Sequence, residues 1–553
     1  MKALRLLTYV ITSQSAALRS HGAERRKWPQ FTGAAGLAAG GGARLASQSR
    51  ALLRWLSLLS ILLPSRAFGR TITIHIYHTN DIHGWIMARP SSYGPNELHG
   101  GAAALAAVYR ADRGPKLLLD AGDWFQGTPE GTLTKGRAMA DIFNAIPYDA
   151  VAVGNHDFDF DEARLEELAR EIKIPVLSAN IRRQKDHARV DYVLPWIIKD
   201  VAGVKIGLFG LLTTKMRYLT FPKNIEGLEF RREVDEAKDA VKALRARGAT
   251  VVIAITHMGF EKNDGPSFEG DQTLASEVPG IDLIVGGHSH TALKESIKDA
   301  TYGTVIVQAG SYLMAVGKVD LEVDSATGRA VSARGRLIAL RTDKTGQDPQ
   351  ILKIVERYAQ EIGHELDVVL ATATRALPSD RHAESALGDW MTDCERRWAK
   401  TDLAFQNAGG IRAPMPAGPV TRRTIFNIMP FENYIVKLNM RGGLVSEALE
   451  HGVGNAPGVL QLSGLQVSYN ASRPAGKRLV SASIGGKLLD DRASYSAAAV
   501  DFMVKGGDGY SAFDRAERQD ATGVLLRDVL ERCAKEQGVI VAPAGGRIVE
   551  VER

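Results

Sequence analysis

The sequence predicts an α/β protein whose first domain stacks two β-sheets, with helices on their outer faces. From Thr71 to about Val323, runs typical of buried strands alternate with runs of helical spacing. Two later runs, residues 304–308 and 317–323, have no helix between them, which indicates a second sheet. Five of the strand-like runs end in polar side chains, and α/β folds carry their reactive groups at such strand ends.

Length and composition agree with a globular chain of several domains. The 553 residues are 45% hydrophobic and 24% charged, which is typical of soluble proteins with two or three domains. We expect an N-terminal extension with an export signal at 1–67 and the two-sheet domain at 71–342. A linker helix at 348–365 would lead to a second, α+β domain for substrate recognition at 368–553.

The net charge of +6 comes from the N-terminal extension. Of the 69 basic and 63 acidic residues, ten basic residues and one acid, Glu24, lie in residues 1–67, which leaves 59 basic against 62 acidic residues in the rest. The body of the chain is therefore slightly acidic. We expect no binding to nucleic acid.

An export signal is predicted just before the first domain. The apolar run 55–63 follows Arg50 and Arg54, and small residues lead to a cleavage site near Ala67. The run is much shorter than the roughly 20 residues of a spanning helix. We therefore expect an exported protein, periplasmic or extracellular, with no stable membrane span once the signal is removed.

Cys394 and Cys533 are the only cysteines. One disulfide could form in an exported protein, but two cysteines on expected helices are more often unpaired packing residues. We therefore expect a fold that does not depend on them.

The elements of the first domain follow one another in a regular order. The expected strands are residues 72–78, 116–120, 149–153, 251–255 and 281–285. The expected helices are residues 101–108, 137–144, 162–168 and 232–244.

Metal-binding side chains follow each of these five strands. In extended backbone, residues i and i+2 point the same way, so Asp81 with His83, and His288 with His290, should each aim two ligands at one centre. Imidazoles with a few carboxylates and no thiolate favour Zn, Mn, Fe or Co over Ca or Mg. The donors suffice for two divalent ions, with Asp123 as the natural bridge. They are Asp81, His83, Asp123, Asn155, His257, His288 and His290.

This series resembles the metallophosphoesterase superfamily, whose pattern is D-x-H, G-D, G-N-H-[DE], H and G-H-x-H, and all five blocks occur here in that order. Two ions about 3.5–4 Å apart would activate a water, and a metal-bound hydroxide would attack the phosphorus directly. His156, outside the ligand set, is the candidate to protonate the leaving oxygen. Asp159 would orient its imidazole, and for Asp157 we expect a capping or ligand-orienting role.

The second half of the chain contains different kinds of sequence motif. Asp348-Pro349 opens a run with helical spacing, and the chain beyond it contains glycine-rich, asparagine-rich and proline-rich turns but no cluster of metal ligands. We expect it to recognise the substrate.

Here the resemblance narrows to the 5'-nucleotidase / UDP-sugar hydrolase family and covers about residues 71–513. It implies one metal site at Asp81, His83, Asp123 and His290, and another at Asp123, Asn155, His257 and His288, with His156 and Asp159 as the catalytic dyad. The family often has Gln or Asn where His290 stands.

The same resemblance implies a nucleotide pocket in the second half. Ala408 and Glu432 replace glycines of the family motifs. Two Phe rings would sandwich the base, an Asp would accept from the ribose hydroxyls, and Arg side chains would bind phosphate. The implied substrate-binding residues are Arg381, Asn407, Arg412, Phe431, Asn433, Phe502 and Asp508.

These observations favour an exported phosphohydrolase acting on nucleoside 5'-monophosphates, and on UDP-sugars or other nucleotides, in nucleotide catabolism. The alternatives are a 2',3'-cyclic nucleotide phosphodiesterase, a SoxB-type sulfur-oxidation hydrolase and a non-catalytic binding protein. Asp159 disfavours the first, the Phe431–Phe502 pair disfavours the second, and the complete ligand set disfavours the third. The oligomeric state and the preferred metal stay open.

Overall fold

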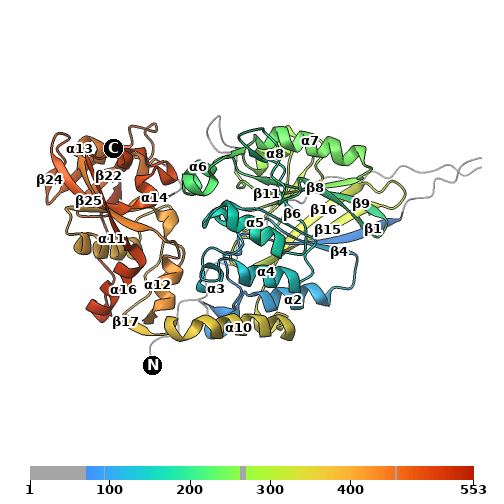
Figure 1. Cartoon of the computed structure of the whole chain (residues 1–553), viewed down its shortest axis with the longest axis horizontal. Helices are drawn as coiled ribbons and strands as arrows, with labels where there is room; N and C mark the ends of the chain where they lie inside the picture. Colours follow the sequence, from blue (N-terminus) through green and yellow to red (C-terminus); the bar gives the residue numbers. More distant parts are fainter. Residues whose placement is uncertain (1–69, 92–93, 262–268, 455–457, 553) are drawn as a thin grey trace, which may run out of the picture. The chain divides into compact units, whose positions relative to one another are not determined.

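The structure is a computed structural model that describes residues 70–91, 94–261, 269–454 and 458–552 (Figure 1). The expected extension and export signal at 1–67 lie outside the described residues.

The first sheet is built around β1, which carries the first ligand motif at its end. The parallel strands β1, β4, β5 and β6 adjoin one another in this order, and β15 pairs antiparallel with β1 on its other side. The register places His75 opposite Lys116 and Asp320. The strands are β1 Thr71–Thr79, β4 Lys116–Asp120, β5 Ala150–Ala152, β6 Val176–Leu177, β15 Ala315–Asp324 and β16 Ala330–Ala339.

The second sheet has β11 near its middle, flanked by the parallel strands β9 and β12. Apolar side chains of the two sheets form one shared core, as Ile76 and Leu119 of the first do with Ile253 of the second. The expected two-sheet α/β fold is confirmed. The strands are β8 Trp196–Val201, β9 Val204–Leu212, β11 Val251–His257, β12 Leu283–Gly286, β13 Ile297–Lys298 and β14 Val305–Val307.

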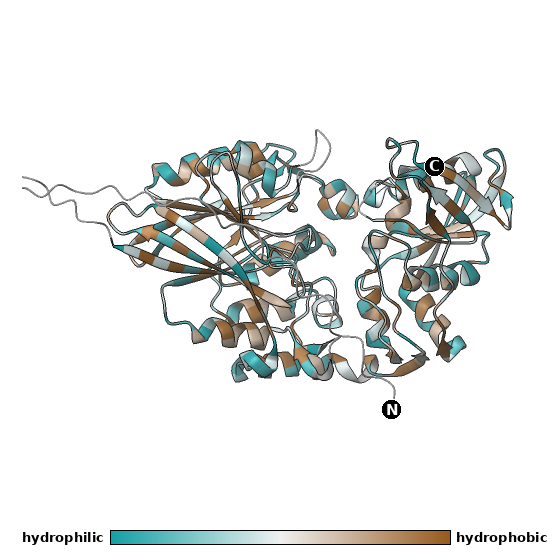
Figure 2. Ribbon diagram, turned by 180° about the vertical axis from the view of Figure 1, so that it is seen from behind, coloured by the Kyte–Doolittle hydropathy of each residue, from teal (hydrophilic) through white to brown (hydrophobic). Residues whose placement is uncertain are grey.

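Helices cover the outer faces of both sheets, because each helix has one apolar face that it buries against a sheet. In Figure 1, α7 and α8 lie on one side of the strands and α2 and α4 on the other. Figure 2 shows the central strands as the most hydrophobic part, whereas the helices alternate in character. The helices are α2 Ala102–Ala111, α3 Pro129–Thr132, α4 Arg137–Ala145, α5 Glu162–Glu171, α6 Met216–Leu219, α7 Glu233–Ala246 and α8 Asp271–Glu277.

Short elements complete this half. They are the hairpin β2 Arg89–Ser91 and β3 Gly94–His99, the pair β7 Ile181–Arg183 and β10 Leu228–Phe230, the 3-10 turns η1 Asn155–Phe158 and η2 Pro222–Ile225, and helix α9 Thr342–Thr345.

A long helix, α10 (Pro349–Leu366), stands where the linker helix is expected. The Asp348 side chain caps it by accepting from the backbone N–H groups of Gln350 and Ile351. Ile351, Val355 and Tyr358 are buried in the core that also holds helices α2 and α4.

The second half has its own core and mixed helices and sheets. Its largest sheet has five strands in the order β21-β18-β25-β20-β26. The strands are β17 Val369–Ala373, β18 Leu403–Gln406, β19 Gly418–Thr421, β20 Tyr434–Arg441, β21 Gln461–Ser463, β22 Gln466–Tyr469, β23 Leu479–Ile484, β24 Lys487–Leu488, β25 Ser494–Val500, β26 Arg518–Leu525, β27 Val539–Ile540 and β28 Ile548–Glu550. The helical segments are α11 Ala386–Ala399, η3 Ala408–Gly410, α12 Arg422–Ile428, α13 Gly442–Gly452, α14 Asp501–Val504, η4 Gly507–Gly509, α15 Ser511–Asp514 and α16 Leu526–Gln537.

The two cysteines form a disulfide, so the expectation of unpaired packing residues is wrong. Cys394 of α11 and Cys533 of α16 are 139 residues apart in sequence, yet their Cα atoms lie 5.8 Å from one another. The expectation rested on residue type, whereas the packing of α11 against α16 decides the distance. Separately, within the described part of the chain, none of the helices has the length and apolar character needed to cross a membrane.

Candidate active site

Two groups of metal-binding side chains converge at the ends of the central strands. One contains Asp81, His83 and His290, and the other contains Asp123, His257 and His288. Within each group, the potential ligand atoms lie within 4.8 Å of one another. These groups come from the loops after β1, β4 and β12 and from the end of β11, so the predicted meeting of strand ends is observed.

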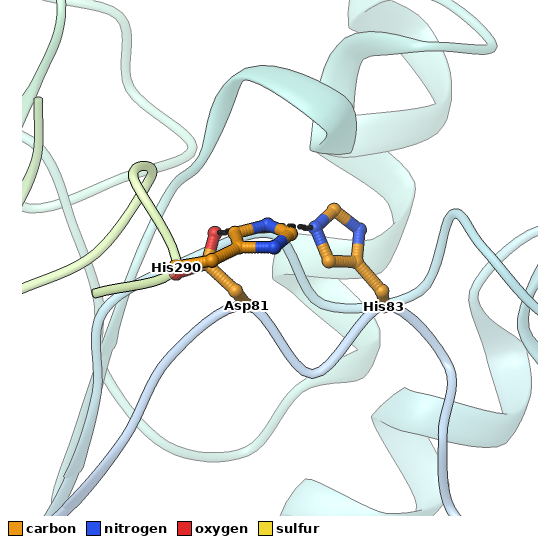
Figure 3. A group of neighbouring side chains, drawn as sticks. All are labelled: Asp81, His83 and His290. Atoms are coloured by element: carbon orange, nitrogen blue, oxygen red, sulfur yellow. Dashed lines mark hydrogen bonds and ion pairs between the residues drawn. The ribbon is translucent and has the colours of Figure 1, made fainter. Parts of the chain in front are cut away.

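In the first group, two imidazoles face one another. The Nε2 atoms of His83 and His290 are 3.1 Å apart, and His290 Nε2 lies 3.4 Å from Asp81 Oδ1. Figure 3 shows the two rings pointing together, with Asp81 beside them and His290 arriving from a different loop.

The second group includes an amide oxygen as well. His257 Nε2 lies 3.1 Å from Asp123 Oδ2 and 3.1 Å from Asn155 Oδ1. His288 Nδ1 lies 2.8 Å from the same Asn155 oxygen. The Asn155 amide oxygen therefore lies beside both histidines of this group.

His288 and His290 lie in different groups, so the expectation that they aim at one centre is wrong. That expectation assumed extended backbone, in which residues i and i+2 share a face. The φ angles are +79° at His288 and +55° at His290, in the left-handed region. The segment is therefore not extended, so the i and i+2 rule does not apply to it, and the two rings lie in separate groups, in agreement with the assignment implied by the family resemblance.

Asp123 lies between the groups, because its Oδ2 atom is 3.1 Å from His257 Nε2 and 3.6 Å from His83 Nε2. One carboxylate can therefore contact both candidate centres. The backbone N–H of His156 also donates to the other oxygen, Oδ1, at 2.8 Å.

The electrostatics of the donors fit two divalent cations. Burial opposes ionisation of Asp123, but the neighbouring imidazoles of His257, His156 and His83 together outweigh it and hold the pKa of Asp123 well below its ordinary value. Burial lowers the pKa of His83 and of His288, which keeps both imidazoles neutral and able to bind metal. Burial also acts to lower the pKa of His257, but the Asp123 carboxylate outweighs burial and raises the pKa of His257 to about 10. The Asp123 carboxylate thus favours positive charge beside it, and divalent ions would supply that charge when bound.

Backbone carbonyls fix the orientation of two imidazoles. His83 Nδ1 lies 2.7 Å from the Gln126 carbonyl oxygen, and His257 Nδ1 lies 2.7 Å from the Ala121 carbonyl oxygen. If Nδ1 carries the proton, Nε2 of each ring is free to bind metal, as in many histidine metal sites.

Asp157 orients the loops that carry ligands, as expected. Its carboxylate accepts from three backbone N–H groups, those of Gly154 at 2.7 Å, Trp124 at 2.8 Å and Asp123 at 3.2 Å. It thereby ties the loop after β4 to the loop after β5.

His156 and Asp159 form a pair beside the metal-binding groups. His156 Nδ1 is 2.8 Å from Asp159 Oδ2, and the His156 ring lies 5.4 Å from the His83 ring. Burial raises the pKa of Asp159, against the opposing influence of His156. The pair has the geometry of an imidazole held in one orientation by a carboxylate.

Residues of the second half reach the same place. The Arg412 guanidinium lies 2.8 Å from His83 Nε2, and the Phe431 ring lies 5.5 Å from the His156 ring. Arg381 is half-buried, and both desolvation and the charge of Arg412 lower its pKa.

A second cluster in this half surrounds Asp508. Asn407 Nδ2 donates to Asp508 Oδ2 at 2.6 Å, and the Phe502 ring packs against Gly507. Asn433 is buried, and no hydrogen bond or ion pair connects its side chain to the other predicted substrate residues in the part of the chain that the structure describes.

Sequence reasoning missed Tyr312. Its ring lies 5.3 Å from the His290 ring and 5.6 Å from the His83 ring, and its hydroxyl donates to the Arg412 carbonyl at 3.3 Å. Tyr312 falls outside the five blocks, and a single tyrosine in a loop carries no sequence signal of its own.

Comparison with known proteins gives the family. The sequence profile of the calcineurin-like phosphoesterases matches residues 74–292, and that of the 5'-nucleotidase C-terminal domain matches residues 362–515. Protein UshA of Yersinia enterocolitica is 30% identical over 505 residues, which cover 84% of this chain and 91% of that protein. The chain belongs to the 5'-nucleotidase family.

Other members agree. A snake venom 5'-nucleotidase of Naja atra is 29% identical over 86% of this chain and 98% of its own length. The crystal structure of a 5'-nucleotidase precursor from Thermus thermophilus has a TM-score of 0.81 at 29% identity, covering 87% of this chain and all (100%) of that one. The sulfate thiohydrolase SoxB from the same genus shares the fold, with a TM-score of 0.74 at 19% identity. This protein is therefore a metal-dependent phosphoester hydrolase, and the family supports hydrolysis of nucleoside monophosphates.

Proposed function

We propose that this chain is an exported 5'-nucleotidase that uses two divalent ions and also cleaves UDP-sugars. The observation that carries the proposal is the position of Asp123, whose one oxygen lies within 3.1 Å of His257 and 3.6 Å of His83. Asp81, His83, Asp123 and His290 would hold one ion, and Asp123, Asn155, His257 and His288 the other. Bound ions of this kind activate water and neutralise phosphate oxygens.

His156 would act on the leaving group. Its ring belongs to neither metal-binding group, and Asp159 holds its Nδ1 at 2.8 Å, so Nε2 is the atom that would deliver a proton to the leaving oxygen. Arg412, 2.8 Å from His83, would contact the phosphate with Arg381. Guanidinium groups suit this role because they donate two parallel hydrogen bonds to phosphate.

The second half would bind the nucleoside. Phe431 and Phe502 are half-buried, which leaves aromatic surface for a base to stack upon. Asp508, held by Asn407 at 2.6 Å, would accept from the ribose hydroxyls. Asn433 would complete the loop beside Phe431.

The test is phosphate release from AMP, UDP-glucose, ADP, 2',3'-cyclic AMP and a thiosulfonate, using metal-free protein reconstituted with Mn, Zn or Co. We expect the highest kcat/KM with a nucleoside 5'-monophosphate and measurable cleavage of UDP-glucose. A preference for the cyclic nucleotide would favour the phosphodiesterase alternative. A preference for the thiosulfonate would favour the SoxB-type alternative.

Export is a separate part of the proposal. It rests on the apolar run 55–63 before Ala67, and relatives described as a venom enzyme and as a precursor agree with it. N-terminal sequencing of native protein should give a start close to Phe68. A start at Met1 would contradict export by this signal.

A further inference from the structure

A strand that carries no proposed ligand ends in a side chain that anchors a ligand loop. Gln308 directly follows β14 and is fully buried, with 0% exposure. Among the described residues, the hydrogen bonds of its side chain all go to one short stretch, Gly287–Thr291, which contains His288 and His290.

The contacts of Gln308 enclose both histidines. Gln308 Oε1 accepts from the Ser289 hydroxyl at 2.9 Å and from the Thr291 backbone N–H. Gln308 Nε2 donates to the Gly287 carbonyl at 3.0 Å. The stretch is therefore held before His288, between the two histidines and after His290.

The loop needs such an anchor. With φ angles of +79° and +55°, His288 and His290 occupy the left-handed backbone region, which is unfavourable for non-glycine residues. Such conformations persist only where surrounding contacts determine them. A fully buried amide with its donor and acceptor both used supplies contacts of this kind.

The same strand end also holds the first ligand loop. Asn80 Oδ1 accepts from the Ala309 backbone N–H at 2.8 Å. Asn80 Nδ2 donates to the Gly310 carbonyl at 2.6 Å and to Asp81 Oδ2 at 2.6 Å. Residues 308–310 thus contact both loops whose side chains meet in Figure 3.

We propose that Gln308 is a positioning residue for metal binding, which fixes His288 and His290 in their left-handed conformations and, with Asn80, sets their distance from Asp81. The proposal rests on the metal ligands proposed above and does not depend on which nucleotide the enzyme prefers.

The test compares Gln308→Met with a matched control, Gln461→Met. Gln461 is also fully buried and anchors a loop of the second half. Its Oε1 accepts from the Ser385 N–H at 2.9 Å, and its Nε2 donates to the carbonyls of Ala383 and Val459, both at 3.0 Å. Both variants lose a buried amide, but only one loses contacts to the metal-ligand loop.

Titration of metal-free protein with Mn²⁺ or Zn²⁺ should show binding that is about 10- to 100-fold weaker in Gln308→Met, the usual effect of losing an outer-shell partner. Gln461→Met should stay within about twofold of wild type, although both variants melt at a lower temperature. Equal metal affinity in Gln308→Met and wild type, or equal loss in both variants, would overturn the proposal.

Gln308→Glu covers the case in which the Met variant does not fold. It keeps the acceptor for Ser289 and Thr291 but turns an oxygen toward the Gly287 carbonyl, so metal binding should again weaken by about tenfold or more. Unchanged affinity in a folded Gln308→Glu protein would also overturn the proposal. If wild-type protein itself binds fewer than two ions, the ligand assignment fails first, and stoichiometry separates that outcome from a failed anchor.

Discussion

The loops that carry the proposed metal ligands and the loops that carry the proposed substrate residues are built differently. Five of the seven proposed ligands have φ angles between +50° and +79°. Among the proposed substrate residues, only Asp508 has a positive φ, of +52°. Asp123 is nearly inaccessible to solvent, with 1% exposure, whereas Phe431 and Phe502 are half-buried.

This difference follows from what each half must bind. Imidazoles and carboxylates that share a small centre need a backbone that places them accurately, so local strain is held by surrounding hydrogen bonds. A planar base can stack on an aromatic ring in many similar positions, so recognition tolerates looser loops. Substitutions of the proposed metal ligands should therefore abolish chemistry, and those of the proposed stacking residues should change substrate preference.

Asp123→Asn should have the largest effect. Loss of a bridging carboxylate removes negative charge from both proposed metal centres. If this costs several kcal/mol of transition-state stabilisation, turnover should fall by about 10³-fold or more. Elemental analysis should show reduced metal content in Asp123→Asn, whereas the control Asp343→Asn, at an exposed position, should keep both metal ions. Two bound ions and near wild-type turnover would refute the bridging role.

His156→Ala should separate proton transfer from metal binding. We expect both ions to remain bound while kcat falls about 10²- to 10⁴-fold, the usual contribution of a positioned acid. Asp159→Asn should cause a smaller loss, since it only orients the imidazole. Loss of metal in His156→Ala would make His156 a ligand.

Phe431→Ala combined with Phe502→Ala should change specificity. Stacking contributes about 1–3 kcal/mol per base, so KM for AMP should rise about 10- to 100-fold. Hydrolysis of p-nitrophenyl phosphate, which has no nucleobase, should change less than about twofold, and Tyr302→Ala should affect neither substrate. Equal loss with both substrates would contradict the proposed division between the halves.

The disulfide should matter for stability rather than chemistry. Replacing Cys394 and Cys533 together by Ala opens a loop whose ends are 139 residues apart, which should cost about 2–5 kcal/mol. Thermal unfolding should begin at a lower temperature, with p-nitrophenyl phosphate turnover at 25 °C retained. Identical melting of the variant and the oxidised wild type would show that the bond adds no stability.

The smallest effect is expected at Glu395, where the contribution to stability should depend on pH. It is fully buried, neither of its oxygens has a hydrogen-bond partner among the residues that the structure describes, and burial raises its pKa to about 8, from 4.5 when exposed. Between these values the folded state binds a proton that the unfolded state has lost, so stability should fall as pH rises from about 4.5 to 8.

Glu395→Gln removes that dependence. Its melting temperature should exceed that of wild type by more at pH 8 than at pH 5, by about 2–4 °C for each kcal/mol. Gln466→Glu, at an exposed position of β22, should show no such trend. A difference between Glu395→Gln and wild type that is constant across pH would contradict the buried neutral carboxyl.

Much of the site was predictable because its signals are local. A strand followed by Asp81-Ile-His83, or by Gly154-Asn155-His156, carries its own evidence for a polar strand end. The order of strands and helices likewise indicated two sheets. The division of His288 and His290 between two centres could not be predicted from their spacing, because the i and i+2 rule assumes extended backbone and these two residues lie outside it.

The α/β class, the candidate donors, the bridging place of Asp123 and the pair His156–Asp159 could all be predicted from residue type and near spacing. Two contacts emerge only in the folded chain: Gln308 anchors a loop some 20 residues earlier, and Cys394 reaches Cys533. These contacts join segments that are separated along the chain, and their distances are set by how helices and sheets pack.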